Sequence, residues 1–435
     1  MQWIRTLPLP PFSEIVLAKY CLQMSIALAV LVGIVIGVNW IVDPFDVYRV
    51  VRKRGFNACK PTYEHYARLA KIIQVEKIPK AGLALGSSRT QYGVDMSHPF
   101  WEGKGGWNLA VNGANMYVLR RFFEHSAAVA PLEKVIIGLD FFMFNGLNHQ
   151  ELSDDSYFAT DKNGHFNKRR WLRQYVLTLG TGSAFFASIK TLRKQKPIDD
   201  EFALDGRMLT SRERKKILKG TGFNKKFLKI EKEFALSNWT SCANNAFTYE
   251  SAQGYNMMDE FRKVVALANQ RKIKLYLIIS PIHARLVETL YGVELGTKFE
   301  QWKRDLKEIV DQSNAQTGHP PVELWDFTGY SVYTTEPVPS DSERNKPMQW
   351  YLDPSHYSVE LGNIMLDRLT GKNSPYPFGD QLTSASIDHV LGKERMERAD
   401  FNRAHTELAN LIRGNAAKFY QERKRNGKYC TVSVH

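Results

Sequence analysis

The sequence predicts an α/β protein built on a doubly wound parallel sheet. Several segments are short, continuous apolar runs, as expected for strands that are covered on both faces. Segments with helical apolar spacing separate these runs, which is the pattern of a parallel sheet with helices between its strands. The expected strands are residues 81–86, 106–114, 134–144, 274–283 and 321–329, and the expected helices are residues 62–78, 116–129, 257–273 and 298–312.

Composition limits the class of protein further. The chain has 435 residues and is 43% hydrophobic, so most of it should fold around a core. The four cysteines are widely spaced and form no CxxC pair, which argues against a zinc site or a disulfide framework. They are Cys21, Cys59, Cys242 and Cys430. We expect no metal and no cofactor.

Residues 20–42 form a run without charged side chains. As a helix this run would cross roughly 30 Å of hydrocarbon, and Pro44 would end it. The run is too long for a cleaved signal peptide, and no small-residue cleavage site follows it. We therefore expect an N-terminal tail at 1–19, a transmembrane helix at 20–42 and a connector at 43–80.

The charges that flank this helix favour one orientation. Arg5 and Lys19 precede it, and four basic residues follow within a short distance: Arg49, Arg52, Lys53 and Arg54. By the positive-inside rule, the larger part of the chain would then be cytoplasmic.

Most of the net charge of +14 comes from one segment, residues 161–232. This segment holds 19 lysine and arginine residues against 7 acidic residues. Such a region attracts anions, so anionic lipid, acidic polysaccharide or nucleic acid are candidate partners, and a solvated helical surface is the alternative. Nucleic acid is disfavoured, because few aromatic residues are interleaved and no recognised motif is present.

Polar residues follow the expected strands at their carboxyl ends, which meet at one edge of a parallel sheet. These segments are Gly86-Ser87-Ser88-Arg89, residues 112–115, residues 138–140 and residues 280–283. A serine hydroxyl here would be a nucleophile only if a base took its proton. Near the C-terminus, "LDPSHYS" supplies Asp353 and His356, a carboxylate and an imidazole within reach of each other.

"LGSSR", "NLAVNGAN", "VIIGLD" and "LDPSHYS", in this order, resemble the SGNH (GDSL-type) serine hydrolase superfamily. More narrowly, the chain is similar to membrane-anchored bacterial members that partner membrane-bound O-acyltransferases in acylating cell-wall polymers or exopolysaccharides. The resemblance implies a flavodoxin-like SGNH domain at 81–371, with the basic segment as a helical insertion and a helical tail at 372–435. It also implies that this domain lies outside the cytoplasmic membrane, against the flanking charges.

The resemblance implies roles for individual residues. Ser88 takes the nucleophile position, His356 the base and Asp353 the orienting acid. The amides of Ser88 and Gly113 would stabilise the oxyanion. Asp140 stands where the family usually has an oxyanion-binding asparagine, and Asn112 or Asn115 would have to replace that donor.

Two further residues near this edge have open roles. Arg89 either binds an anionic substrate group or pairs with an acid inside the fold. His283, just past a strand, is expected to line the pocket. The resulting hypothesis is a membrane-anchored serine esterase or O-acyltransferase acting on an extracytoplasmic polysaccharide. The alternative is a catalytically weak binding or assembly protein of the same fold in a polysaccharide modification or export complex.

Overall fold

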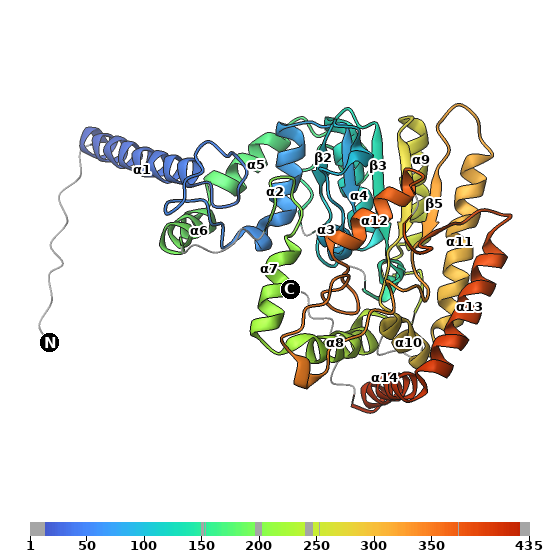
Figure 1. The fold of residues 1–435 in the computed structure, drawn as a ribbon. Helices are drawn as coiled ribbons and strands as arrows, with labels where there is room; N and C mark the ends of the chain where they lie inside the picture. The colour runs from blue at the N-terminus through green and yellow to red at the C-terminus, as the bar shows by residue number, and fades with distance from the viewer. Residues whose placement is uncertain are drawn as a thin grey trace, which may run out of the picture. The chain divides into compact units, whose positions relative to one another are not determined.

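A computed structural model describes residues 14–148, 152, 154–195, 202–239, 247–251, 253–372 and 374–426. Its centre is a six-stranded sheet with the order β2-β1-β3-β4-β5-β6 (Figure 1). The strands are β1 (Gly82–Leu85), β2 (Gly106–Asn108), β3 (Lys134–Leu139), β4 (Lys274–Ile279), β5 (Glu323–Asp326) and β6 (Asp380–Gln381). The first five are parallel, and their order 2-1-3-4-5 is that of flavodoxin-like sheets.

The sheet is mixed, because β6 pairs antiparallel with β5 through Trp325↔Gln381 and Asp326↔Asp380. The prediction of a wholly parallel sheet is therefore wrong at this edge. Each of the five predicted strands is present in shortened form. The sixth has only two residues and carries no apolar run that would mark it in the sequence.

Helices connect and cover the strands. Those around the sheet are α2 (Tyr63–Lys77), α3 (Ser88–Gly93), α4 (Met116–Val129), α9 (Met257–Gln270), α10 (Ala284–Gly292), α11 (Gly296–Asn314) and α12 (Val359–Leu369). The others are α1 (Glu14–Val42), α5 (Arg170–Leu179), α6 (Gly182–Arg193), α7 (Thr210–Lys219), α8 (Gly222–Glu233), α13 (Ile387–Ala404) and α14 (Thr406–Asn426). Short helical turns are η1 (Pro99–Trp101), η2 (Phe141–Phe144), η3 (Gly146–Asn148), η4 (Phe234–Asn238) and η5 (Asp341–Glu343).

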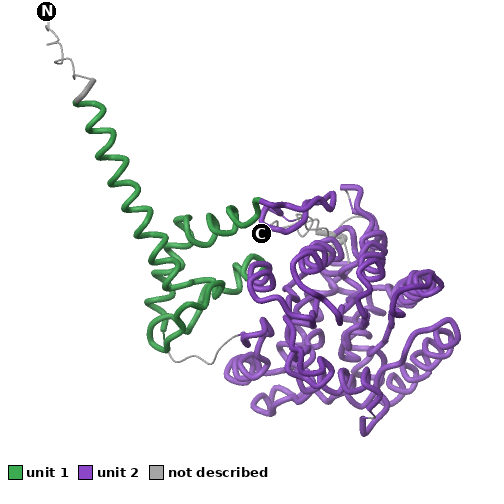
Figure 2. The backbone as a smooth tube through the Cα atoms, turned by 90° about the horizontal axis from the view of Figure 1, so that it is seen from above, with its two compact units in different colours: residues 1–70, 169–198 green, residues 71–168, 199–435 purple. Residues whose placement is uncertain are grey.

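The chain forms two compact units (Figure 2). Unit 1 comprises residues 1–70 and 169–198, and unit 2 comprises residues 71–168 and 199–435. The basic segment 161–232 was expected as a single insertion, but it is divided between the units. Its helices α5 and α6 belong to unit 1, whereas α7 and α8 belong to unit 2.

Within the described part of the chain, α1 is the one helix long and apolar enough to cross a membrane, over Val16–Val42. The helix begins before the predicted residue 20 and includes the charged residues Glu14 and Lys19. Cys21 is exposed on this helix, and Cys59 is half-buried in unit 1. Cys242 and Cys430 lie outside the described residues.

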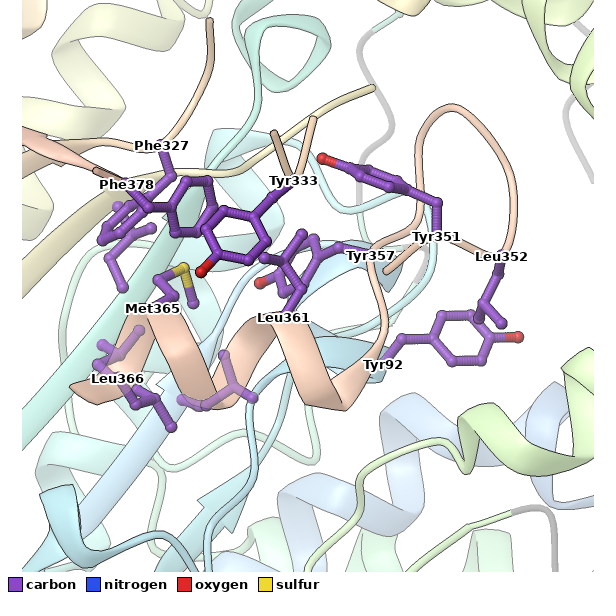
Figure 3. Packing of buried hydrophobic residues seen from close by; sticks show 14 of the residues in the cluster. Tyr92, Phe327, Tyr333, Tyr351, Leu352, Tyr357, Leu361, Met365, Leu366 and Phe378 are labelled. Carbon is purple, nitrogen blue, oxygen red and sulfur yellow. The ribbon is translucent and has the colours of Figure 1, made fainter. Parts of the chain in front are cut away.

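In unit 2, an aromatic-rich core fixes the position of α12 (Figure 3). Leu361 and Met365, one turn apart, point into this core and are fully buried. The helix α12 also packs against α3, where Gly362 of α12 meets Gly93 of α3. A Cβ on Gly362 would lie 1.8 Å from the carbonyl oxygen of Gly93, so the two backbones are in direct contact. Glycine at this crossing sets the distance between the chain segments that carry Ser88 and His356.

Candidate active site

The Gly86 turn places Ser88 at the end of β1. Gly86 has φ +152°, and a Cβ there would lie 2.2 Å from Thr90 Oγ1, so only glycine fits. Ser87 then caps α3, because its side chain accepts a hydrogen bond from the Arg89 amide at 3.2 Å. Ser88 is therefore the first residue of the helix, and it is half-buried whereas Ser87 is fully buried.

A tight turn between Tyr351 and Tyr357 carries the histidine and its acid. These two residues form an antiparallel bridge that closes the turn. Inside it, Asp353 Oδ1 accepts the amide N–H groups of Ser355 at 2.9 Å and His356 at 3.0 Å. The backbone of the turn thus orients the carboxylate toward the imidazole of His356.

The structure brings Ser88, His356 and Asp353 together as a hydrogen-bonded series. Ser88 Oγ lies 2.7 Å from His356 Nε2, and His356 Nδ1 lies 2.8 Å from Asp353 Oδ2. With Nδ1 donating to the carboxylate, Nε2 is the basic nitrogen that accepts the hydroxyl proton. Asp353 is 2% exposed, whereas the His356 side chain is 20% exposed. Ser88 and His356 are therefore partly exposed, whereas Asp353 is buried beneath them.

Lys226 on α8 is a further member of this site. Burial by itself would raise the pKa of Asp353, but the His356 imidazole and then the Lys226 ammonium outweigh burial and lower that pKa. Lys226 Nζ lies 3.8 Å from Asp353 Oδ2 and 3.6 Å from Glu213 Oε1. In the sequence Lys226 is one of many lysines in the basic segment, and no pattern distinguishes it.

Asp140 does not present an unpaired charge to the site. Its Oδ1 lies 2.8 Å from Arg89 Nη1, and Oδ2 accepts a hydrogen bond from the Ser87 hydroxyl. Arg89 also donates from Nε to Ser355 Oγ at 3.0 Å. Because Arg89 is 4% exposed and engaged in this way, the structure favours its expected alternative role as the partner of a buried acid.

The turn at 111–114 lies at the same edge as Ser88. The Val111 amide donates to the Gly86 carbonyl at 3.1 Å, and Gly113 follows with φ +65° in an exposed position. The Ser88 amide is at the first helical position, where the helix itself offers no acceptor. The Ser88 amide is thus at a helix N-terminus beside its own hydroxyl, and the oxyanion role expected for the Gly113 amide stays a prediction.

The two asparagines proposed as substitute donors differ. Asn112 is exposed beside Gly113. Asn115 is buried and caps α4, since its side chain accepts the Val118 amide at 2.9 Å. Asn115 is thus a structural cap, and its asparagine identity is explained without an oxyanion.

His283 was expected to line the pocket, and the structure corrects this. Its Nδ1 accepts the Arg285 amide and its Nε2 donates to the Glu336 carbonyl, at 3.1 and 2.8 Å. Burial lowers its pKa to about 3, so the ring is neutral. The His283 amide donates to the Pro354 carbonyl at 3.0 Å. His283 therefore supports the turn that carries Asp353 and His356.

The arrangement is a serine hydroxyl, an imidazole and a carboxylate linked in series by hydrogen bonds, which is geometry that suits a nucleophile, a base and an orienting acid. Among the residues that the structure describes, no group of three or more His, Cys, Asp or Glu side chains is placed to hold a metal ion. The sequence matches no family model and no curated protein.

Proposed function

We propose that the protein is a membrane-anchored serine esterase or O-acyltransferase that acts on an extracytoplasmic polysaccharide or cell-wall polymer. The observation that carries this proposal is the contact of Ser88 Oγ with His356 Nε2 at 2.7 Å, continued to Asp353. This geometry allows His356 to take the serine proton as the hydroxyl attacks an ester carbonyl.

The reaction has two halves. Ser88 Oγ adds to the acyl carbon, its proton passes to His356 Nε2, and the Ser88 and Gly113 amides bind the resulting oxyanion. When the intermediate collapses, His356 returns the proton to the departing alkoxide, leaving an acyl group on Ser88. Water or a sugar hydroxyl then gives its proton to His356 and attacks this ester. As the bond to Ser88 Oγ breaks, His356 returns that proton to Ser88, and the acid or the acylated sugar is released.

The proposed substrate and location depend on the resemblance to membrane-anchored SGNH proteins. It is carried by "LGSSR", "NLAVNGAN", "VIIGLD" and "LDPSHYS", and these blocks supply the residues that meet at the site. The helix α1, which is long and apolar enough to span a membrane, suits a protein that works at a membrane, with a membrane-bound O-acyltransferase as its proposed partner. In this proposal the catalytic unit lies on the periplasmic or outer side of the cytoplasmic membrane.

One observation favours the second candidate, a binding or assembly protein. Asp140 occupies the third sequence block and is committed to Arg89 and Ser87, so this block supplies no side-chain donor to an oxyanion. Loss of one such donor typically costs about 10²–10³ in rate. In this alternative the site retains its geometry but holds a polymer without cleaving it.

Labelling of the full chain in detergent tests the proposal. A fluorophosphonate probe and a small acetyl ester would be offered to the wild-type protein, to Ser88→Ala and to His356→Ala. We expect labelling and hydrolysis in the wild type and their loss in both variants. Ser97→Ala, an exposed serine away from the site, is the control and should behave as the wild type.

Ser87→Ala separates the two adjacent serines. Because Ser87 is buried against Asp140, its variant should still carry the label, and the labelled peptide should show it on Ser88. A folded wild-type chain that takes no label and cleaves no ester would refute free-standing catalysis and favour the binding role.

A further inference from the structure

Helices α5 and α6 are attached to the end of the apolar helix α1 within unit 1 (Figure 2). Asn39 is fully buried there. Its side-chain amide donates to the Leu179 carbonyl at 2.7 Å and accepts from the Ser188 hydroxyl at 2.8 Å. Tyr48, just past α1, adds a hydroxyl contact with Thr178 at 2.6 Å. The position of α5 along α1 is therefore fixed by specific polar contacts.

The α5 helix has the reverse of the usual amphipathic arrangement. Its buried residues include the polar Gln174 and Thr178. Its exposed residues include four large apolar side chains that recur at helical spacing and so share one face. These are Trp171, Leu172, Tyr175 and Val176, with exposed fractions of 53%, 52%, 45% and 41%. A continuous apolar face turned outward indicates that something other than water covers it.

The charge around this face identifies the chemistry of what covers it. Residues 162–198 contain no Asp or Glu. Arg169, Arg170 and Arg173 lie at the start of α5, next to the apolar face. A helix with an apolar, aromatic face and a basic border is the kind that lies in the interface of an anionic bilayer.

The point at which α5 packs along α1 also places α5 at the membrane interface. From Val16 to Asn39, α1 rises roughly 35 Å at 1.5 Å per residue, which slightly exceeds the thickness of a bilayer's hydrocarbon. With α1 spanning, Asn39 and the helices bound to it would lie at headgroup level. Trp40, the next residue, is 45% exposed, as suits an aromatic ring at the interface.

We propose that α5 lies in the interface of the anionic bilayer that α1 spans, with the four apolar residues of its outer face among the lipids and its arginines at the headgroups. This inference depends on α1 spanning the membrane and not on the chemistry of Ser88. It assigns the first part of the basic segment to lipid, whereas α7 and α8 belong to the catalytic unit.

The test uses the full chain in liposomes of phosphatidylglycerol and phosphatidylcholine, with the four native cysteines changed to serine. Leu172→Cys would carry the environment-sensitive dye NBD, and Val176→Cys, one turn later, would be a second reporter. Met396→Cys on α13, an apolar residue that is 63% exposed in unit 2, is the matched control.

We expect blue-shifted emission from residues 172 and 176 that is quenched by lipids with brominated acyl chains, and neither effect at residue 396. Arg169→Glu with Arg173→Glu should weaken the quenching, and Ser88→Ala should leave it unchanged. Emission at 172 and 176 that is as water-like as at 396 would overturn the proposal. Blue-shifted emission without bromolipid quenching would also overturn it, because a protein surface would then cover the face.

Discussion

Arg89 and Asp140 form a buried ion pair that links the sequence blocks of the site. Arg89 belongs to the segment that carries Ser88, and Asp140 follows β3. Arg89 also donates through Nε to Ser355 Oγ, in the turn that carries Asp353 and His356. Asp140 therefore fixes Arg89, and Arg89 in turn links the segment of Ser88 to the turn of His356. This role accounts for an aspartate at position 140.

The losses of stability on removing the two members of this pair should not be additive. Arg89→Met and Asp140→Leu each leave an uncompensated buried charge, and such losses cost about 3–5 kcal/mol. The double variant should lose less than the sum of the single losses. Urea unfolding of the detergent-solubilised chain measures all three free energies, and simple additivity would contradict the coupling.

Asp353→Asn should keep the turn intact and lose activity. Its side-chain oxygen still accepts the Ser355 and His356 amides, but the amide cannot stabilise the imidazolium that forms during attack. A loss of about 10⁴ in kcat is expected, as for the equivalent change in other serine triads. Ester hydrolysis and the rate of fluorophosphonate labelling measure it. Unchanged rates would show that Asp353 does not orient a catalytic base.

Lys226→Met should shift the pH profile of activity. The Lys226 ammonium lowers the pKa of Asp353, so its removal raises that pKa. The loss of activity that follows protonation of Asp353 at low pH should therefore move to higher pH in the kcat/KM profile. Lys225→Met removes the same charge from an exposed position on the same helix and should leave the limb in place. Equal shifts in both variants would indicate only a general charge effect.

Neutral, buried His283 should make the fold sensitive to acid. Its pKa is lowered to about 3 from 6.5, so between these values the unfolded chain binds one more proton than the folded chain. The free energy of unfolding should therefore decrease as pH falls from 6.5 toward 3. The variant His283→Asn keeps a capping side chain but cannot bind this proton. The slope of its unfolding free energy against pH should therefore be smaller, by an amount that corresponds to at most one proton. Equal slopes in the two proteins would contradict this explanation.

The sequence was a good guide to local structure wherever the pattern was strong. The expected helix at 116–129 coincides with α4, and the five apolar runs each contain a strand. Ser88, Asp353 and His356 could be chosen because a serine after a strand and an Asp-x-x-His turn are short, recognisable units. Their meeting depends on the fold, in particular on the glycine contact between α3 and α12.

Other features leave no local signal. Lys226 approaches Asp353 because α8 packs inside unit 2, where the ring of the neighbouring residue Phe227 contacts the His283 ring edge-on. His283 follows a strand end as a pocket residue would, but the surrounding backbone takes both its ring nitrogens. β6 is defined by its pairing with β5 and not by its two polar residues. The outward apolar face of α5 lies within residues 161–232, where the excess of lysine and arginine dominates the sequence pattern.

The contacts of Asn39 constrain how the protein is made. Its partners Leu179 and Ser188 follow it by 140 and 149 residues. If α1 enters the membrane during synthesis, it does so long before the ribosome has made α5 and α6, which pack on its C-terminal end. Until then the side chain of Asn39 is without its two partners from α5 and α6. A shortened chain that begins after α1 would leave α5 and α6 without the helix on which they pack. A soluble fragment that contains Ser88 and His356 should therefore omit residues 169–198 as well.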